Sequence, residues 1–265
     1  MRPEATWLFV PGNVPGRFAK AAAAGADAVV VDLEDAVRPE DKNTARAETL
    51  CWLSEGGQAW VRLNASGTLW FDADVDAVAG ASGLLGVLVP KAEDPAALAA
   101  LAARLGPDTA VVALIETAAG LHRVHDVATT LGVTRLAFGA LDLAAELGAD
   151  DTAEAMLFAR STIVLASRVA GLPAPIDGVT TVVHDADAVT TAARRARSLG
   201  FRGKLCIHPA QIEPTARGLA PSAADIAWAR DVLQAADGSA GAVTGPDGRM
   251  IDKPVLDRAH AILRP

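Results

Sequence analysis

Ionisable side chains follow most of the short apolar stretches of this chain, at the point where each stretch ends. They are, in chain order, Asp32, Glu34, Asp35, Arg62, Lys91, Glu93, Glu116, Asp142, Asp177 and His208. Carboxylates are oxygen ligands of the kind that Mg²⁺ prefers, and the planar fork of an arginine matches a carboxylate. Carboxylates also cap helices, so spacing alone leaves metal binding and helix capping equally open for Glu116 and Asp142.

The apolar stretches themselves have the pattern of buried strands. They cover residues 7–10, 28–31, 59–63, 84–89, 110–115, 135–138, 174–176 and 205–207. Most are continuous rather than alternating, which is typical of parallel strands covered on both faces. The C-terminal ends of such strands meet at one rim of a closed barrel, where catalytic groups lie. The recurrence of ionisable residues therefore predicts one shared site.

Helical segments separate these strands. Pro15 and Gly25 bound one helix, and Asp94-Pro95 and Gly106 bound another, as expected for helix starts and ends. Two further helices are predicted over residues 153–170 and 185–199. Eight strand–helix units favour a (β/α)₈ TIM barrel over an open doubly wound sheet. No Gly-x-Gly-x-x-Gly follows the first strand, which disfavours a dinucleotide-binding fold.

The pattern changes after Gln211. Ser222 and Asp225 form a capping-box pattern, a glycine-rich segment covers residues 237–253, and a final amphipathic helix is predicted over 255–263. A segment this long without regular structure is often functional. We therefore expect a TIM-barrel catalytic domain over residues 1–215 and a C-terminal helical extension over residues 216–265.

Composition limits the class of partner. The chain has 265 residues, 51% of them hydrophobic, and a formal net charge of −8. This charge disfavours nucleic acid and anionic membranes as partners, but it allows a small anionic substrate in a local cationic pocket. Two distant cysteines and the lack of any apolar run of about 18 residues indicate a cytoplasmic protein with no disulfide framework and no membrane span.

Nine motifs in order resemble those of the citrate lyase beta subunit-like proteins, within the HpcH/HpaI aldolase group of CoA-ester lyases. They are LFVPGNVPGRFAKA, VVDLEDAV, VRLN, VPKAE, LIETAAG, FGALDLAAELG, PIDGV, GKLCIHPAQI and GRMIDKPVLDRA. The resemblance implies a TIM barrel, Mg²⁺ and a homo-oligomer, often a homotrimer. It also implies reversible carbon–carbon cleavage of a 3-hydroxyacyl-CoA thioester, such as malyl-CoA or citramalyl-CoA, to a 2-oxo acid and an acyl-CoA.

The resemblance also implies roles for single residues. Glu116 and Asp142 correspond to the two metal ligands, and Arg62 to the residue that binds the substrate carboxylate. Asp252 corresponds to an acid/base that enters the active site of a neighbouring protomer, although an ordinary helix N-cap before Pro254 is the alternative. Many relatives carry a polar residue before the metal-binding aspartate, where this chain has Leu141.

The remaining candidates are assigned to substrate and coenzyme A. Asp32 and Glu34 lie on one side of an extended segment and are expected near the substrate and the water shell of the metal. Lys91 either contacts substrate or neutralises the carboxylate cluster, and an ion pair with Glu93 at the rim is the equally open alternative. Arg17 and Lys20 either bind the phosphates of coenzyme A or belong to a solvated helix face.

For Asp35 a functional role and helix capping are equally open, whereas Asp177 and His208 are more typical of structural hydrogen bonding.

Three alternative functions stay open. One is a citrate lyase beta subunit that acts on an acyl-carrier-protein thioester, and another is an acyl-CoA thioesterase. The third is a catalytically silent barrel. Free CoA released from a thioester would indicate hydrolysis, and an activity insensitive to Glu116→Ala would indicate a silent barrel.

Overall fold

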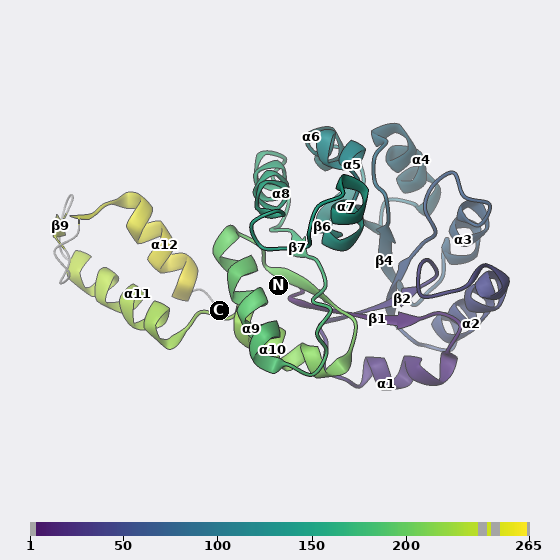
Figure 1. Ribbon diagram of the computed structural model, residues 1–265, viewed down its shortest axis with the longest axis horizontal. Helices are drawn as coiled ribbons and strands as arrows, with labels where there is room; N and C mark the ends of the chain where they lie inside the picture. The colour runs from purple at the N-terminus through teal and green to yellow at the C-terminus, as the bar shows by residue number, and fades with distance from the viewer. Residues whose placement is uncertain (1–3, 238–242, 245–249, 264–265) are drawn as a thin grey trace. The chain divides into compact units, whose positions relative to one another are not determined.

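The computed structural model of the chain describes residues 4–237, 243–244 and 250–263 (Figure 1). The chain forms two compact units, Pro3–Leu219 and Ala220–Pro265. The first unit ends four residues beyond the boundary expected after residue 215, because helix α10 (Ile212–Leu219) continues to Leu219. Among these residues no helix combines the length and the hydropathy needed to cross a bilayer.

The first unit is a closed barrel of eight parallel strands, which confirms the predicted TIM barrel. The strands follow one another around the barrel in chain order, and β8 pairs with β1 to close it. They are β1 (Thr6–Pro11), β2 (Ala28–Asp32), β3 (Ala59–Arg62), β4 (Leu84–Val89), β5 (Ala110–Ile115), β6 (Val133–Phe138), β7 (Ile176–Asp177) and β8 (Gly203–Cys206).

Helices connect the strands on the outside of the barrel (Figure 1). The α-helices are α1 (Phe18–Ala22), α2 (Lys42–Ser54), α3 (Phe71–Val78), α4 (Pro95–Leu105), α5 (Ala118–His122), α6 (Val124–Ala128), α7 (Ala140–Leu147), α8 (Leu157–Val169), α9 (Ala186–Leu199) and α10. Short 3₁₀ turns are η1 (Pro15–Arg17), η2 (Pro39–Asp41) and η3 (Pro209–Gln211). The expected helix start at residue 153 is wrong, because residues 153–156 form turns before α8.

Side chains of alternate strand residues pack on opposite faces of the barrel wall. Trp7, Trp60, Leu88, Leu114 and Leu205 belong to a core cluster inside the barrel. Neighbouring strand residues pack outward against the helices, in a second and larger cluster. A Cβ at Gly86 would lie 2.3 Å from the Trp60 ring, so a residue without a side chain makes room for that indole.

The second unit is a helical pair with a short hairpin. Helix α11 (Ala223–Ala236) begins with the predicted capping box of Ser222 and Asp225. Strands β9 (Val243–Thr244) and β10 (Met250–Ile251) pair antiparallel, and α12 (Lys253–Leu263) follows, two residues earlier than expected. Arg258 lies over the Trp228 ring at 4.6 Å. Gly248 and Arg249 of the GRMIDKP motif lie outside the described residues.

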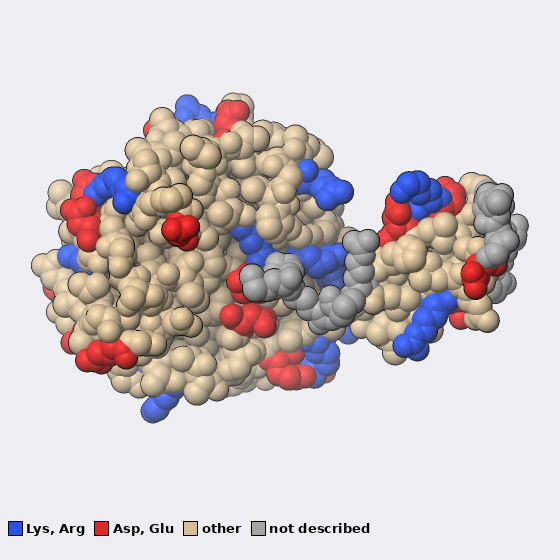
Figure 2. Space-filling view, turned by 180° about the vertical axis from the view of Figure 1, so that it is seen from behind, with Lys and Arg blue, Asp and Glu red and all other residues tan. Residues whose placement is uncertain are grey.

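Charged residues on the surface are of both signs. Figure 2 shows acidic and basic side chains interspersed over a mostly uncharged face.

A buried ion cluster lies at the end of β7, where Asp177 accepts hydrogen bonds from Arg160 at 2.8 Å and from Lys204 at 3.2 Å. Burial raises the pKa of Asp177, but Lys204 and Arg160 outweigh burial, so its pKa is lower than usual.

Asp177→Asn is expected to reduce the free energy of unfolding by about 3–5 kcal/mol at neutral pH, because it breaks a buried ion cluster. The folded pKa of Asp177 is below the unfolded value, so this stability is present above about pH 4 and lost as the pH falls through the folded pKa. Denaturant unfolding at pH 7 and pH 3 should show the difference between the two proteins shrinking at acid pH. An equal difference at both values would contradict the assigned contacts.

Candidate active site

A cavity of about 350 Å³ opens at the C-terminal ends of the barrel strands. Five ionisable residues line it: Asp32, Asp35, Arg62, Glu116 and Asp142. They come from β2, β3, β5 and the first turn of α7, or from the segments that follow these strands. The structure therefore brings together the carboxylates and the arginine that the sequence placed at one rim.

Arg62 is held by the acidic segment after β2. Its Nε and Nη2 donate to the two carboxylate oxygens of Asp32 at 2.7 and 2.6 Å. Its Nη1 lies 3.1 Å from Glu34 Oε2 and 3.6 Å from Asp35 Oδ2. The guanidinium also stacks 4.8 Å over the ring of Phe9. These contacts fix the guanidinium plane at the cavity wall.

The pairing with Asp32 limits how Arg62 can bind a substrate. A guanidinium has five N–H groups, and Asp32 occupies the edge formed by Nε and Nη2. Asp32 does not use the edge formed by Nη1 and Nη2, so a second carboxylate there would share Nη1 with Glu34 and Asp35. Asp32 also accepts hydrogen bonds from the backbone of Glu34 and Ala36, so its acceptor sites are occupied. In this geometry Asp32 orients Arg62 and the segment after β2.

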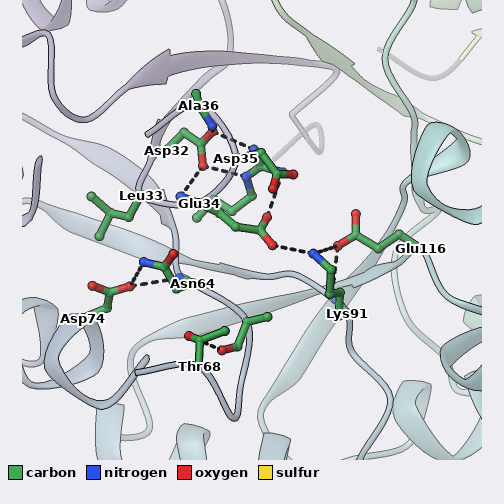
Figure 3. A network of polar contacts seen from close by, with 12 residues as sticks. Asp32, Leu33, Glu34, Asp35, Ala36, Asn64, Thr68, Asp74, Lys91 and Glu116 are labelled. Carbon is green, nitrogen blue, oxygen red and sulfur yellow. Dashed lines mark hydrogen bonds and ion pairs between the residues drawn. The ribbon is translucent and has the colours of Figure 1, made fainter. Parts of the chain in front are cut away.

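Glu34 and Lys91 connect this network to Glu116 (Figure 3). Lys91 Nζ donates to Glu34 Oε1 at 2.7 Å and lies 3.9 Å from Glu116 Oε1. Burial raises the pKa of Glu34, and Arg62 and Lys91 oppose that effect only in part. Lys91 thus pairs with Glu34, and no hydrogen bond or ion pair between Lys91 and Glu93 is found among the described residues.

Lys91 also fixes Glu116 through its backbone. Its φ of 48° makes it the one non-glycine residue of the described chain in the left-handed region. Its N–H donates to Glu116 Oε1 at 2.9 Å. Such a conformation is costly for a residue with a side chain and often occurs at functional sites. Here it turns a backbone amide toward the carboxylate of Glu116.

Glu116 and Asp142 have the properties of a hard-cation site. Glu116 is buried, and burial together with the charges of Glu34 and Asp142 raises its pKa to about 8. Asp142 is exposed and accepts no hydrogen bond from the described residues. A dication would relieve this concentration of negative charge. Within the described part of the chain no three ligand side chains gather around one point. The pair therefore fits Mg²⁺, which is held by one or two carboxylates and completed by water or substrate.

Gly139 leaves room for the Glu116 carboxylate. A Cβ at this position would lie 2.4 Å from Glu116 Cβ and 2.5 Å from Oε2. The φ of Gly139 is −102°, so an alanine backbone is allowed there. The glycine is therefore required by close approach of the carboxylate.

Gly139→Ala is expected to weaken Mg²⁺ binding by about 10–100-fold, because it displaces a ligand that its surroundings orient. Calorimetric titration with MgCl₂ measures this change. Gly16→Ala is the control, since a Cβ at Gly16 meets no atom within 4 Å. An unchanged Mg²⁺ affinity in Gly139→Ala would show that Glu116 is not a ligand of the metal.

Lys42 binds the backbone of the acidic segment after β2. It was not identified as a site residue from the sequence. Its Nζ donates to the carbonyl oxygens of Leu33 and Glu34, both at 2.7 Å, and lies 5.2 Å from the Trp70 ring centre. Its burial lowers its pKa more than the nearby carboxylates raise it. The sequence signal was a lysine at the start of a helix, which is usually solvent-exposed.

Lys42→Met is expected to lower the free energy of unfolding by about 2–5 kcal/mol, because it leaves two buried carbonyl groups without a donor. Denaturant unfolding measures this loss, with Lys253→Met as the control at a side chain that is 83% exposed. Equal stability of both variants would show that water replaces the ammonium at no cost.

Three other predicted residues of the first unit do not line this cavity, and Asp252 belongs to the second unit. Arg17 and Lys20 are exposed on η1 and α1 and do not line the cavity. Asp252 lies in the second unit, where its Oδ1 accepts a hydrogen bond from Val255 N–H at 3.2 Å, as a helix cap does. His208 Nδ1 accepts from Ala210 N–H at 3.1 Å, in the structural role expected for it.

Sequence comparison identifies relatives over almost the whole chain. The model of the HpcH/HpaI aldolase/citrate lyase family matches residues 5–209. A citrate lyase subunit beta-like protein of Mycobacterium tuberculosis is 38% identical, over 97% of this chain and 94% of its own length. Two Cereibacter sphaeroides proteins also match: a (3S)-malyl-CoA thioesterase, 34% identical over 94% and 90% of the two chains, and an L-malyl-CoA/beta-methylmalyl-CoA lyase, 31% identical over 99% and 94%.

A solved structure agrees with these relatives. CitE of M. tuberculosis, in complex with magnesium, acetoacetate and coenzyme A, superimposes with a TM-score of 0.87 at 36% identity. The match covers 100% of this chain and 98% of that one. Fold, motif order and full-length similarity agree, and this chain belongs to the HpcH/HpaI aldolase/citrate lyase family.

Proposed function

We propose that this protein is a magnesium-dependent carbon–carbon lyase that cleaves a 3-hydroxyacyl-CoA thioester, such as malyl-CoA or citramalyl-CoA. The products would be a 2-oxo acid and an acyl-CoA, and the reverse reaction is condensation. The observation that supports this most is that buried Glu116, partly buried Arg62 and exposed Asp142 line one cavity. Relatives that bind magnesium, 2-oxo acids and coenzyme A support the same reaction class.

Arg62 orients the substrate in this reaction. The carboxylate of the 2-oxo acid portion would bind at the edge formed by Nη1 and Nη2, which Asp32 does not use, and would share Nη1 with Glu34 and Asp35. Glu116 and Asp142 would hold Mg²⁺, which when bound supplies Lewis-acid stabilisation of a developing oxyanion. The Lys91–Glu34 pair holds the network between them.

Bond cleavage divides the substrate between C2 and C3, counted from the thioester carbonyl. The 3-hydroxyl proton passes to solvent water, the C2–C3 bond breaks, and its electron pair passes to C2. The products are then a 2-oxo acid and a thioester enolate, and one proton added at C2 gives the acyl-CoA. Asp252 of a neighbouring protomer supplies that proton, and in condensation the same carboxylate removes it.

A homotrimer in which Asp252 acts between protomers has a direct test. Asp252→Asn and Glu116→Gln variants should each be inactive alone. After the two are mixed and exchange protomers, some sites receive both intact residues, and activity returns. No recovery after verified exchange would place Asp252 in its own protomer or outside catalysis.

Hydrolysis is the second candidate, because a (3S)-malyl-CoA thioesterase is among the relatives. The discriminating assay incubates malyl-, citramalyl- and 3-hydroxy-3-methylglutaryl-CoA with and without Mg²⁺, and measures the 2-oxo or 3-oxo acid and free CoA separately. The lyase predicts the oxo acid and acyl-CoA without free CoA. Free CoA without an oxo acid would indicate a thioesterase, and no turnover of any of them would count against both. An acyl-carrier-protein thioester in a second arm tests the citrate lyase alternative.

A further inference from the structure

The last two barrel strands contribute an apolar wall to the cavity. The ionisable residues at their ends turn elsewhere: Asp177 pairs with Arg160 and Lys204, and His208 caps η3. Val179 and Ile207 line the cavity in their place. Of the strands followed by ionisable residues, β7 and β8 are thus two whose ionisable residues do not line the cavity.

Buried polar side chains hold this wall in place. Gln211 is 1% exposed, and its amide nitrogen donates to the carbonyl oxygens of Thr180 at 2.7 Å and Val182 at 3.0 Å. Its amide oxygen accepts from Ile207 N–H at 2.9 Å. One side chain thus joins the segment after β7 to the segment after β8.

Lys204 binds the backbone on the N-terminal side of Val179. Its Nζ donates to the Gly178 carbonyl oxygen at 2.5 Å and is also paired with Asp177. The backbone on both sides of Val179 is therefore bound to buried side chains. A wall fixed in this way keeps its shape when ligand binds.

The cavity therefore has a charged part and an apolar part. The five ionisable lining residues form the charged part, and Val179, Ile207 and Phe9 belong to the apolar part. Ile207 is 43% exposed, so it presents apolar surface at the cavity that no protein group among the described residues covers. Covering such surface with an alkyl group is favourable because it removes apolar surface from water.

We infer that Val179 and Ile207 form a subsite for an alkyl substituent on one of the two carbons that separate in the reaction. The preferred substrates are then alkyl-substituted 3-hydroxyacyl thioesters rather than the unsubstituted one. The substituent belongs either to the 2-oxo acid portion or to the acyl portion. This inference rests on the proposed lyase function. A methyl group in an apolar pocket changes kcat/KM by about 10–200-fold.

The test compares malyl-CoA with two methylated substrates. Citramalyl-CoA carries the methyl group on the 2-oxo acid portion, and beta-methylmalyl-CoA carries it on the acyl portion. The unchanged protein is expected to favour one of them over malyl-CoA by at least about tenfold in kcat/KM. Val179→Thr and Ile207→Thr should each reduce that ratio at least about fivefold, because a hydroxyl replaces apolar contact surface. Val182→Thr is the matched control, since Val182 is 47% exposed in the same segment and does not line the cavity.

Binding of 2-oxo acids separates failure of the inference from failure of the proposed function. In the presence of Mg²⁺, calorimetry measures glyoxylate, pyruvate and 2-oxobutyrate with the unchanged protein and Val179→Thr. If thioesters turn over with no preference and no sensitivity to Val179→Thr, the subsite is disproved while the lyase stands. If no thioester turns over, the lyase fails. The subsite then stands only if pyruvate binds more tightly than glyoxylate, or propionyl-CoA more tightly than acetyl-CoA in the same calorimetry, and Val179→Thr removes the difference. Equal binding within both pairs overturns it as well.

Discussion

Glu116→Gln is expected to lower the magnesium-dependent turnover by about 10³-fold and to leave the melting temperature nearly unchanged. The loss corresponds to several kcal/mol of charge stabilisation, at 1.36 kcal/mol for each factor of ten. Stability should persist because burial and the neighbouring carboxylates raise the pKa of Glu116 to about 8. The neutral amide thus resembles the protonated form that prevails without metal at neutral pH, and its oxygen still accepts the Lys91 N–H.

Kinetic assay and calorimetric Mg²⁺ titration check this prediction together. Glu93→Gln is the matched control, because Glu93 follows the neighbouring strand and makes no hydrogen bond or ion pair among the described residues. Activity and Mg²⁺ affinity should both fall in Glu116→Gln and stay unchanged in Glu93→Gln. If Glu116→Gln retained Mg²⁺ affinity, the assigned ligand set would be wrong.

Arg62→Met is expected to have the second largest effect, on activity and on stability. It removes the group that binds the substrate carboxylate, and it leaves the buried Asp32 carboxylate without its two shortest contacts. Breaking one partner of a buried ion pair costs about 3–5 kcal/mol of unfolding free energy. We expect kcat/KM to fall by about 10²–10³-fold, as for loss of a preorganised donor at an active site.

A double variant separates the two roles of Arg62. In Arg62→Met with Asp32→Asn, the uncompensated carboxylate is gone. The double variant should therefore lose less unfolding free energy than the sum of the two single losses, by about 0.5–3 kcal/mol. Activity should stay low, since no group replaces the guanidinium. Denaturant unfolding and kcat/KM are measured for all four proteins. Recovery of activity along with stability would mean that Arg62 acts only through the fold.

Much of the fold follows from local patterns in the sequence. Continuous apolar stretches marked the parallel strands, and Asp94, Pro95 and Gly106 marked the ends of α4, where the Asp94 side chain accepts from Ala96 N–H. The rule that the C-terminal ends of barrel strands form one rim was sufficient to place Arg62, Glu116 and Asp142 in one cavity. These features depend on period and position, which a sequence displays directly.

Side-chain partners were less predictable, because they depend on contacts between distant segments. Asp32 was expected at the substrate, but its carboxylate is occupied by Arg62, thirty residues away. Lys42 resembles a surface lysine in sequence and becomes buried only when α2 packs below the acidic segment. Asp177 is the last residue of β7, and Glu116 directly follows β5, yet Asp177 pairs with Lys204 and Arg160 and does not line the cavity.

The central claim is that Glu116 and Asp142 together hold a divalent cation. The most direct measurement is a crystal structure with Mn²⁺ in place of Mg²⁺, located by its anomalous scattering, since carboxylate sites accept both ions. Our account predicts an anomalous peak about 2.0–2.2 Å from carboxylate oxygens of both residues, with a 2-oxo acid added to the crystal completing the coordination. Mn²⁺ bound elsewhere, or to only one of the two carboxylates, would contradict it.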